Sequence, residues 1–127
     1  MKVRISDGDC PEVELSGTAV EWLALALAVR HDGVVIPCES GSDPQPYARF
    51  GHQMVVAHVP GQKVRFTIAN DGIEIAGDPA HLETLSQVMS GFTDSLPHSY
   101  HVHVEYQGDN HYVASGSVPA ILLYLSE

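Results

Sequence analysis

The chain has 127 residues, of which 44% are hydrophobic and 17% are charged; this composition fits one compact globular domain over residues 1–127 and argues against wholesale disorder. Sixteen acidic and six basic residues give a formal net charge of −10, which argues against nonspecific binding to nucleic acid or to an anionic membrane surface. Such a charge keeps a protein soluble, and it also favours association with a positively charged protein face.

No stretch of the sequence predicts a membrane span or a secretion signal. The longest apolar run, Trp22 to Val29, is far shorter than the ~20 residues needed to cross a bilayer, and the first five residues lack the apolar core of a signal peptide. Cys10 and Cys38 each lie beside a proline without a CxxC partner, which predicts two free thiols. We therefore expect a cytoplasmic protein.

The first part of the chain predicts two strands and a helix. Alternating side chains predict a strand over residues 2–6, and a turn signal separates it from a second strand over residues 13–16. Thr18 and Glu21 have the spacing of a capping box at a helix start. Residues 20–29 are almost all apolar, so we expect this helix to be buried on most of its surface.

The middle of the chain predicts a loop and a β-hairpin. A brief β-rich run over residues 34–36 is followed by a proline, and residues 39–51 are rich in serine, glycine and proline, which predicts the least ordered loop of the protein. Two alternating runs over residues 54–59 and 63–69 are joined by a proline-glycine turn. We expect these runs to form an antiparallel pair.

The second half predicts a strand over residues 73–76, a helix, and two further strands over residues 101–106 and 118–125. Asp78 has the position of a helix cap, and Pro79 has the first helical position, where the missing N–H is not needed. Four apolar residues recur at helical spacing and predict a single buried stripe. They are Leu82, Leu85, Val88 and Met89.

The two halves of the chain match each other at an offset of sixty residues. The matched pairs are Val13 and Ile73, Glu14 and Glu74, Leu15 and Ile75, Gly17 and Gly77, Trp22 and Leu82, and Leu25 and Leu85. The match predicts two βαββ repeats, over about 13–69 and 73–125. The expected fold is α+β, with one mostly antiparallel sheet and both helices on one of its faces. The match of Trp22 with a leucine of the apolar stripe predicts a core tryptophan.

A group of polar residues near the second strand pair is a candidate metal site. His101 and His103 stand two residues apart on a predicted strand, so they share one face with Glu105, and His111 could supply a further nitrogen. With eight histidines in the chain, a chance pair on the open face of a sheet explains the same pattern. We favour the solvated or partner-facing strand.

No motif in the sequence predicts an enzyme. Glu14 and Glu74 occupy equivalent places in the two halves, but their alternation with apolar neighbours fits solvated strand positions better than a paired carboxylate site. Residues 115–117 lack the context of a nucleophile elbow, and no phosphate-binding loop occurs. We therefore expect neither catalysis nor a cofactor.

Several segments together carry a family resemblance. They are Ile73 to Pro79, Leu82 with Leu85, Tyr100 to Glu105, and Gly116 to Pro119 with the aliphatic strand that follows. Taken together they resemble the bacterial immunity protein thirty-two family, whose small proteins protect a cell against polymorphic toxins. The resemblance covers about residues 73–125, with a weaker match over residues 13–27, and the insertion between them departs from it.

The resemblance implies stoichiometric binding of a cognate toxin, in which acidic charge speeds the encounter and covers a basic cleft. The expected interface is the open sheet face or the loop over residues 39–51. The candidate contact residues are Glu74, His101, His103, Glu105, Glu39 and Asp43. Two alternatives remain: a metal-dependent enzyme built on the histidine strand, and a structural module whose exposed strand edges pair in a homodimer.

Overall fold

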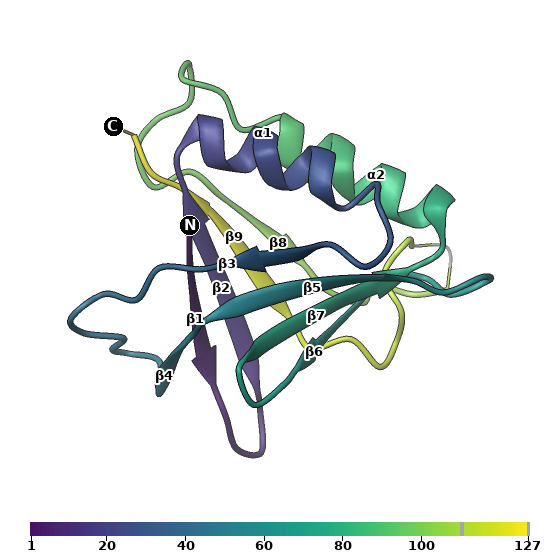
Figure 1. Ribbon diagram of the computed structural model, residues 1–127, viewed down its shortest axis with the longest axis horizontal. Helices are drawn as coiled ribbons and strands as arrows, with labels where there is room; N and C mark the ends of the chain where they lie inside the picture. The colour runs from purple at the N-terminus through teal and green to yellow at the C-terminus, as the bar shows by residue number, and fades with distance from the viewer. Residues whose placement is uncertain (110, 127) are drawn as a thin grey trace.

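The computed structural model describes residues 1–109 and 111–126. In these residues two helices lie side by side above nine strands (Figure 1). The helices are α1 (Ala19–Ala28) and α2 (Pro79–Ser90), and the strands are β1 (Lys2–Ser6), β2 (Glu12–Gly17), β3 (Val35–Pro37), β4 (Arg49–Gly51), β5 (Gln53–His58), β6 (Arg65–Ile68), β7 (Gly72–Gly77), β8 (His101–Val104) and β9 (Ala120–Tyr124). The prediction of an α+β fold is confirmed.

The strands form two sheets, whereas the sequence analysis predicted one. Sheet A has the strand order β4-β1-β2-β9-β8, and sheet B has the order β3-β5-β7-β6. Each sheet is mixed, because β2 pairs parallel with β9 and β5 pairs parallel with β7, while the other pairings are antiparallel. The two parallel pairings join strands that are far apart in the sequence, and local alternation of side chains contains no signal for them.

The two halves of the chain do not fold as separate units. The elements β1-β2-α1-β3-β5 and β6-β7-α2-β8-β9 follow in the same order, apart from the additional strand β4 in the first half. The last strand of each half nevertheless lies in the other half's sheet, β5 beside β7 and β9 beside β2. The structure therefore does not confirm the predicted βαββ repeats.

The predicted loop over residues 39–51 contains a strand at its end. Residues 49–51 form β4, which pairs antiparallel with β1. Three residues are too few to show an alternating pattern, so the pairing depends on β1 rather than on a local signal. One residue after β4 the chain enters β5, and it thereby passes from sheet A to sheet B. Gly72 lies so close to this crossing that an added Cβ would come within 1.9 Å of the carbonyl oxygen of Gln53.

Both helices begin at the predicted caps. The Thr18 hydroxyl and the Glu21 carboxylate form a capping box at the start of α1, and the Asp78 carboxylate accepts the backbone N–H of His81 at 2.8 Å at the start of α2. The predicted stripe of α2 faces inward, with Leu82, Leu85 and Met89 fully buried. The longer helix has 12 residues, and in the described chain neither helix has the length and apolar character to span a membrane.

One hydrophobic cluster lies between the helix layer and the two sheets. Trp22 is fully buried there, its ring stacks on Phe92 at a centroid distance of 4.6 Å, and its indole N–H donates to the carbonyl oxygen of Leu123 at 3.1 Å. The prediction that Trp22 is a core residue is confirmed. Because Leu123 belongs to β9, this side chain ties α1 to the last strand of sheet A.

We predict that Trp22→Ala lowers the free energy of unfolding by about 3–5 kcal/mol, because it leaves a large cavity and removes the donor to Leu123. Leu23→Ala is the matched control, because Leu23 lies next to Trp22 on the same helix but its side chain is 54% exposed. We expect it to change the free energy of unfolding by no more than about 0.5 kcal/mol. Urea unfolding measures both. Equal losses for the two variants would contradict this account of the core.

Candidate functional site

The outward side of α1 is apolar and exposed, which corrects the expectation that this helix is buried on most of its surface. Val20, Leu23 and Leu27 are 70%, 54% and 53% exposed, and the side chain of Ala24 is exposed beside them. The four residues follow the i, i+3, i+4, i+7 spacing of one helical face. We call this surface the α1 face. A row of exposed large aliphatic side chains on one helix is the kind of surface that partners cover.

The outward side of α2 is exposed like that of α1, yet it is polar. The exposed position of α1 therefore does not by itself explain its apolar side chains. The outward positions of α2 include Thr84, Gln87 and Ser90, which are polar and suit contact with water. Both helices lie in the same layer and bury an inward stripe. The chain thus presents one solvated helix and one apolar helix side by side, and of the two outward helix surfaces the α1 face is the one that a partner would cover.

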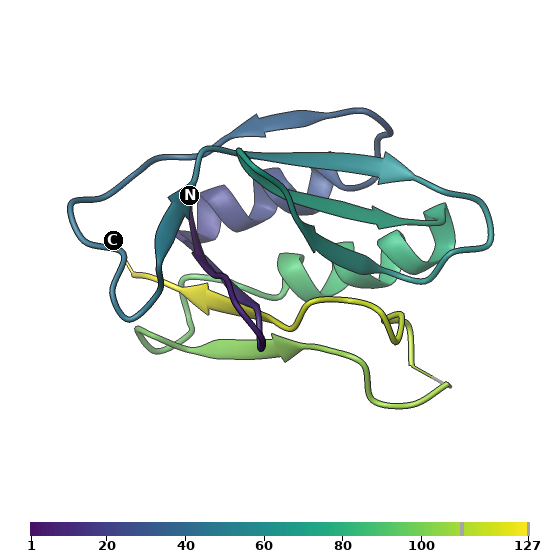
Figure 2. The ribbon, with the colours of Figure 1, turned by 90° about the horizontal axis from the view of Figure 1, so that it is seen from below.

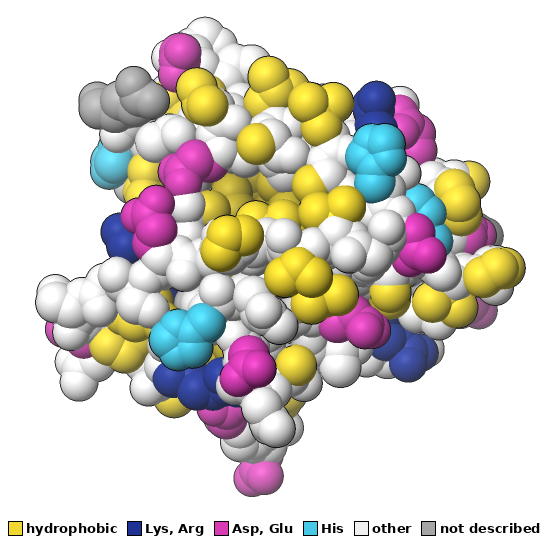
Figure 3. Space-filling model, in the orientation of Figure 1, with side chains coloured by type: hydrophobic (Ala, Val, Ile, Leu, Met, Phe, Trp, Pro, Cys, Tyr) yellow, Lys and Arg dark blue, Asp and Glu magenta, His cyan; other side chains and the backbone are white. Residues whose placement is uncertain are grey.

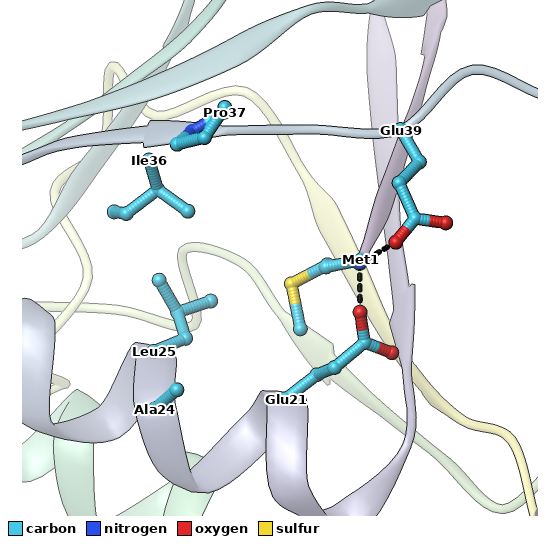
Figure 4. Close-up of a pocket in the computed structure, with 7 residues that line it drawn as sticks. All are labelled: Met1, Glu21, Ala24, Leu25, Ile36, Pro37 and Glu39. Carbon is cyan, nitrogen blue, oxygen red and sulfur yellow. Dashed lines mark hydrogen bonds and ion pairs between the residues drawn. The ribbon is translucent and has the colours of Figure 1, made fainter.

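A pocket of about 280 Å³ adjoins the α1 face, between α1 and the edge strand β3. Seven residues line it: Met1, Glu21, Ala24, Leu25, Ile36, Pro37 and Glu39 (Figure 4). Figure 3 shows that the surface is hollowed here, with hydrophobic side chains at the bottom and acidic side chains nearby. The α1 face and this pocket together form the candidate functional site.

The two ends of the pocket differ in polarity (Figure 4). Leu25 of α1 and Ile36 of β3 point toward each other at the apolar end. At the other end the N-terminal ammonium of Met1 donates a hydrogen bond to the Glu21 carboxylate and lies 3.7 Å from the Glu39 carboxylate. A ligand group in this pocket would therefore contact hydrocarbon on one side and carboxylate on the other.

Glu21 has two roles at this end of the pocket. One carboxylate oxygen accepts the backbone N–H of Thr18 at 3.0 Å, which caps α1, and the other accepts the hydrogen bond from the ammonium of Met1. Burial acts to raise the pKa of Glu21, but the hydrogen bonds from the ammonium and from Thr18 outweigh it, so that the pKa lies below its ordinary value. Glu21 is consequently held in place and charged at neutral pH.

Glu39 differs from Glu21 in its freedom. Its side chain is 72% exposed, compared with 34% for Glu21. Its only described ion-pair partner is the ammonium at 3.7 Å, which also bonds to Glu21. Glu39 therefore retains the capacity to accept hydrogen bonds from a cationic group that enters the pocket.

Cys38 lies next to the pocket in sequence but is a weak nucleophile. Burial, with a smaller contribution from the carboxylates of Glu21 and Glu39, raises the pKa of its thiol to about 11, against the opposing effect of the N-terminal ammonium. The thiol is protonated at neutral pH for this reason. Both Cys38 and the exposed Cys10 are free, as the sequence predicted.

The residues predicted to contact a partner lie on separate elements. Glu74 projects from sheet B, opposite Val55 and Thr67, whereas His101 and His103 project from β8 in sheet A. Glu105 directly follows β8, next to the two histidines in the chain. Asp43 lies elsewhere, as an exposed loop residue whose carboxylate accepts the backbone N–H of Gln45.

Glu39 is the one member of the predicted set that lines the pocket. The apolar members of the site were missed, although their signal was present in the sequence. Residues 20–29 are apolar apart from Glu21, so apolar side chains occupy most of the circumference of α1, and such a helix is either buried on all sides or covered by a partner. Because both sheets lie on the same side of α1, only coverage by a partner fits this structure.

The alternative metal site has an incomplete set of ligands. The imidazole rings of His101 and His103 lie edge to face with centroids 5.3 Å apart. Over residues 1–109 and 111–126, no three His, Cys, Asp or Glu side chains are grouped closely enough to hold a metal ion. His111 therefore does not complete a site with the histidine pair and Glu105 in this conformation.

Comparison of the chain with models of known protein families, with curated proteins and with solved structures gives no significant match. The class that the fold and site define is an α+β protein with an exposed apolar helix and an adjoining pocket that has acidic residues at one end. The resemblance to an immunity protein family stays a prediction from the sequence.

We predict that Glu21→Gln lowers stability mainly above about pH 4.5, because glutamine keeps the capping hydrogen bond but not the charge that pairs with the ammonium. A carboxylate with a lowered folded-state pKa contributes stability above its unfolded pKa of about 4.3 and loses that contribution as pH falls through the folded value. Urea unfolding from pH 7 to pH 3 should show a converging pair of curves. A difference that stays constant with pH would contradict this role.

Proposed function

We propose that the protein is a cytoplasmic immunity protein that binds a cognate bacterial toxin stoichiometrically and neutralises it. The observation that carries the proposal is the exposed α1 face, with its adjoining pocket, on a chain of net charge −10. The family resemblance to bacterial immunity protein thirty-two supports the same function. Neutralisation then follows from covering a functional surface of the toxin.

The arrangement of side chains supports a protein partner. An apolar centre surrounded by polar and charged residues is the usual anatomy of a protein interface. Here the α1 face supplies the centre, and Glu21 and Glu39 lie beside it at the mouth of the pocket. The partner that this surface fits has a basic face from which an apolar or long cationic side chain projects.

The pocket is large enough to take a side chain of a partner, with a volume of about 280 Å³. A lysine, arginine or methionine side chain could place its hydrocarbon stem between Leu25 and Ile36. A cationic head would then reach Glu39. Anchors of this kind supply a large share of the binding energy at interfaces.

The neighbouring strand edge supports binding through side chains rather than through β-strand addition. Strand β3 has three residues and ends at Pro37, which has no backbone N–H to donate. Short edges that contain proline resist pairing with another strand. The partner is therefore expected to lie across the α1 face and not to extend sheet B.

The first test is binding to a toxin encoded next to the gene of this protein. We predict that Leu23→Ala and Leu27→Ala each raise the dissociation constant about tenfold or more, because each removes buried apolar contact worth about 1–2 kcal/mol. Gln87→Ala on the outward side of α2 is the control and should leave the constant unchanged. Isothermal titration calorimetry measures all three. Unchanged binding by both leucine variants would exclude the α1 face as the interface.

The second test concerns charge. We predict that Glu39→Gln slows association with the toxin and weakens the dependence of the association rate on salt, because a charge at the edge of an interface acts mainly on encounter. Asp9→Gln, in the β1–β2 turn, is a control for net charge alone. Stopped-flow measurements of the association rate at two salt concentrations distinguish the effect of Glu39→Gln from that of Asp9→Gln. Equal effects of the two changes would assign the attraction to overall charge and not to this site.

A further inference from the structure

Three of the four sheet edges are protected against pairing with another chain. Strand β6 is followed in space by the segment before β9, since Val118 N–H donates to the carbonyl oxygen of Phe66 at 2.9 Å and Phe66 N–H donates to the Ser117 hydroxyl at 2.9 Å. Strand β3 is short and ends at Pro37, and β4 has three residues and leads directly into sheet B. Proteins use such devices to prevent unwanted strand pairing.

Strand β8 is the fourth edge. Although it has only four residues, it contains no proline and does not lead directly into the other sheet. It comprises His101 to Val104, without proline, lysine or glycine, and it pairs with β9 on one side only. Figure 2 shows β8 along one margin of the molecule, with β3 along the opposite margin. Among the described residues, no strand pairs with its outer side.

The hydrogen-bonding groups of β8 can be assigned from its register. Tyr124 N–H donates to the carbonyl oxygen of Tyr100 at 2.8 Å, and the antiparallel register pairs Val102 with Leu122. Hydrogen-bonded and non-hydrogen-bonded pairs alternate along an antiparallel ladder. The N–H and C=O groups of Val102 therefore face β9, and those of His101 and His103 face outward.

The side chains beside this edge suit a second copy of the chain. On the inner side Val102 is half-buried and Tyr100 is 43% exposed, and both line a hollow of about 80 Å³ together with residues of the C-terminal end of α2. On the outer side His101 and His103 are exposed. Pairing of two copies at this edge would cover the apolar inner side. It would leave His101 and His103 of both copies on the same outer face.

We propose that two copies of the chain associate through β8, antiparallel about a two-fold axis at Val102, so that two five-stranded sheets become one continuous sheet. In this register His101 of each copy lies opposite His103 of the other, and their outward N–H and C=O groups exchange hydrogen bonds. The two copies of Val102 meet at the axis. The contact is self-complementary, as a two-fold interface requires.

This association goes beyond the proposed function and is compatible with it. Strands β3 and β8 lie at opposite margins of the molecule (Figure 2), and the α1 face and its pocket adjoin β3. A pair joined through β8 thus leaves both toxin-binding sites free. An edge contact of four residues is small, so the dimer is expected to be weak, with a dissociation constant in the micromolar range.

Sedimentation equilibrium at concentrations from about 10 μM to about 1 mM tests the proposal, since this range brackets a weak dimer. The wild type should dimerise, and His103→Pro should raise the dissociation constant at least tenfold, because it removes an outward N–H without breaking the pairing with β9. His103→Ala keeps that N–H and should dimerise like the wild type. Circular dichroism shows whether each variant is folded. If His103→Pro does not fold, His103→Lys replaces it, because it places like charges on both sides of the two-fold axis.

A cysteine cross-link tests the register independently. In a Cys10→Ser background, Val102→Cys should form an intermolecular disulfide on mild oxidation, because non-hydrogen-bonded antiparallel pairs have Cα atoms about 4.5 Å apart, within the range that a disulfide spans. Glu105→Cys in the same background should cross-link far less. A wild type that is monomeric at all concentrations, a dimer insensitive to both edge variants, or equal cross-linking at the two positions would overturn the proposal.

Discussion

The two parallel pairings, β2 with β9 and β5 with β7, are the constraint on which the rest of the structure depends. Each places the last strand of one half of the chain in the sheet of the other half. The helix α1 follows β2 of sheet A and α2 follows β7 of sheet B, and the two helices lie side by side in one layer (Figure 1). The buried hydroxyl of Ser86 in α2 donates to the carbonyl oxygen of Ala26 in α1 at 2.6 Å and accepts from Arg30, which fixes the helices against each other.

This arrangement also determines which surfaces remain uncovered. Trp22, Leu25 and Ala26 of α1 are buried, and α2 lies along its flank, so no element of the described chain covers the outward side of α1. Water meets polar residues on α2 but leucine and valine on α1. Folding of the monomer therefore leaves the apolar α1 face exposed to water, and the proposed toxin complex would cover it.

The sequence predicted several local features and missed the long-range ones. The antiparallel pair expected over residues 54–59 and 63–69 was wrong, because β7 lies between β5 and β6 in sheet B. Caps at Thr18 and Asp78, the inward stripe of α2 and the buried Trp22 are set by interactions over a few residues, and they were predicted correctly. The division into two sheets and the strand β4 depend on pairings between distant segments, for which alternation gives no register. Of the candidate contact residues, Glu39 lies at the pocket. The α1 face was misjudged because a helix with almost only apolar residues was assumed to be buried, although a partner can cover it equally well.

We propose that the protein acts by binding a basic toxin through α1 and the adjoining pocket. Hydrogen–deuterium exchange of the protein with and without the toxin encoded beside its gene tests this most directly, since it reports which backbone amides a partner protects. We predict added protection in residues 19–28 and 35–39 and little change in α2. Protection confined to the outer faces of sheets A and B, with α1 unchanged, would contradict it.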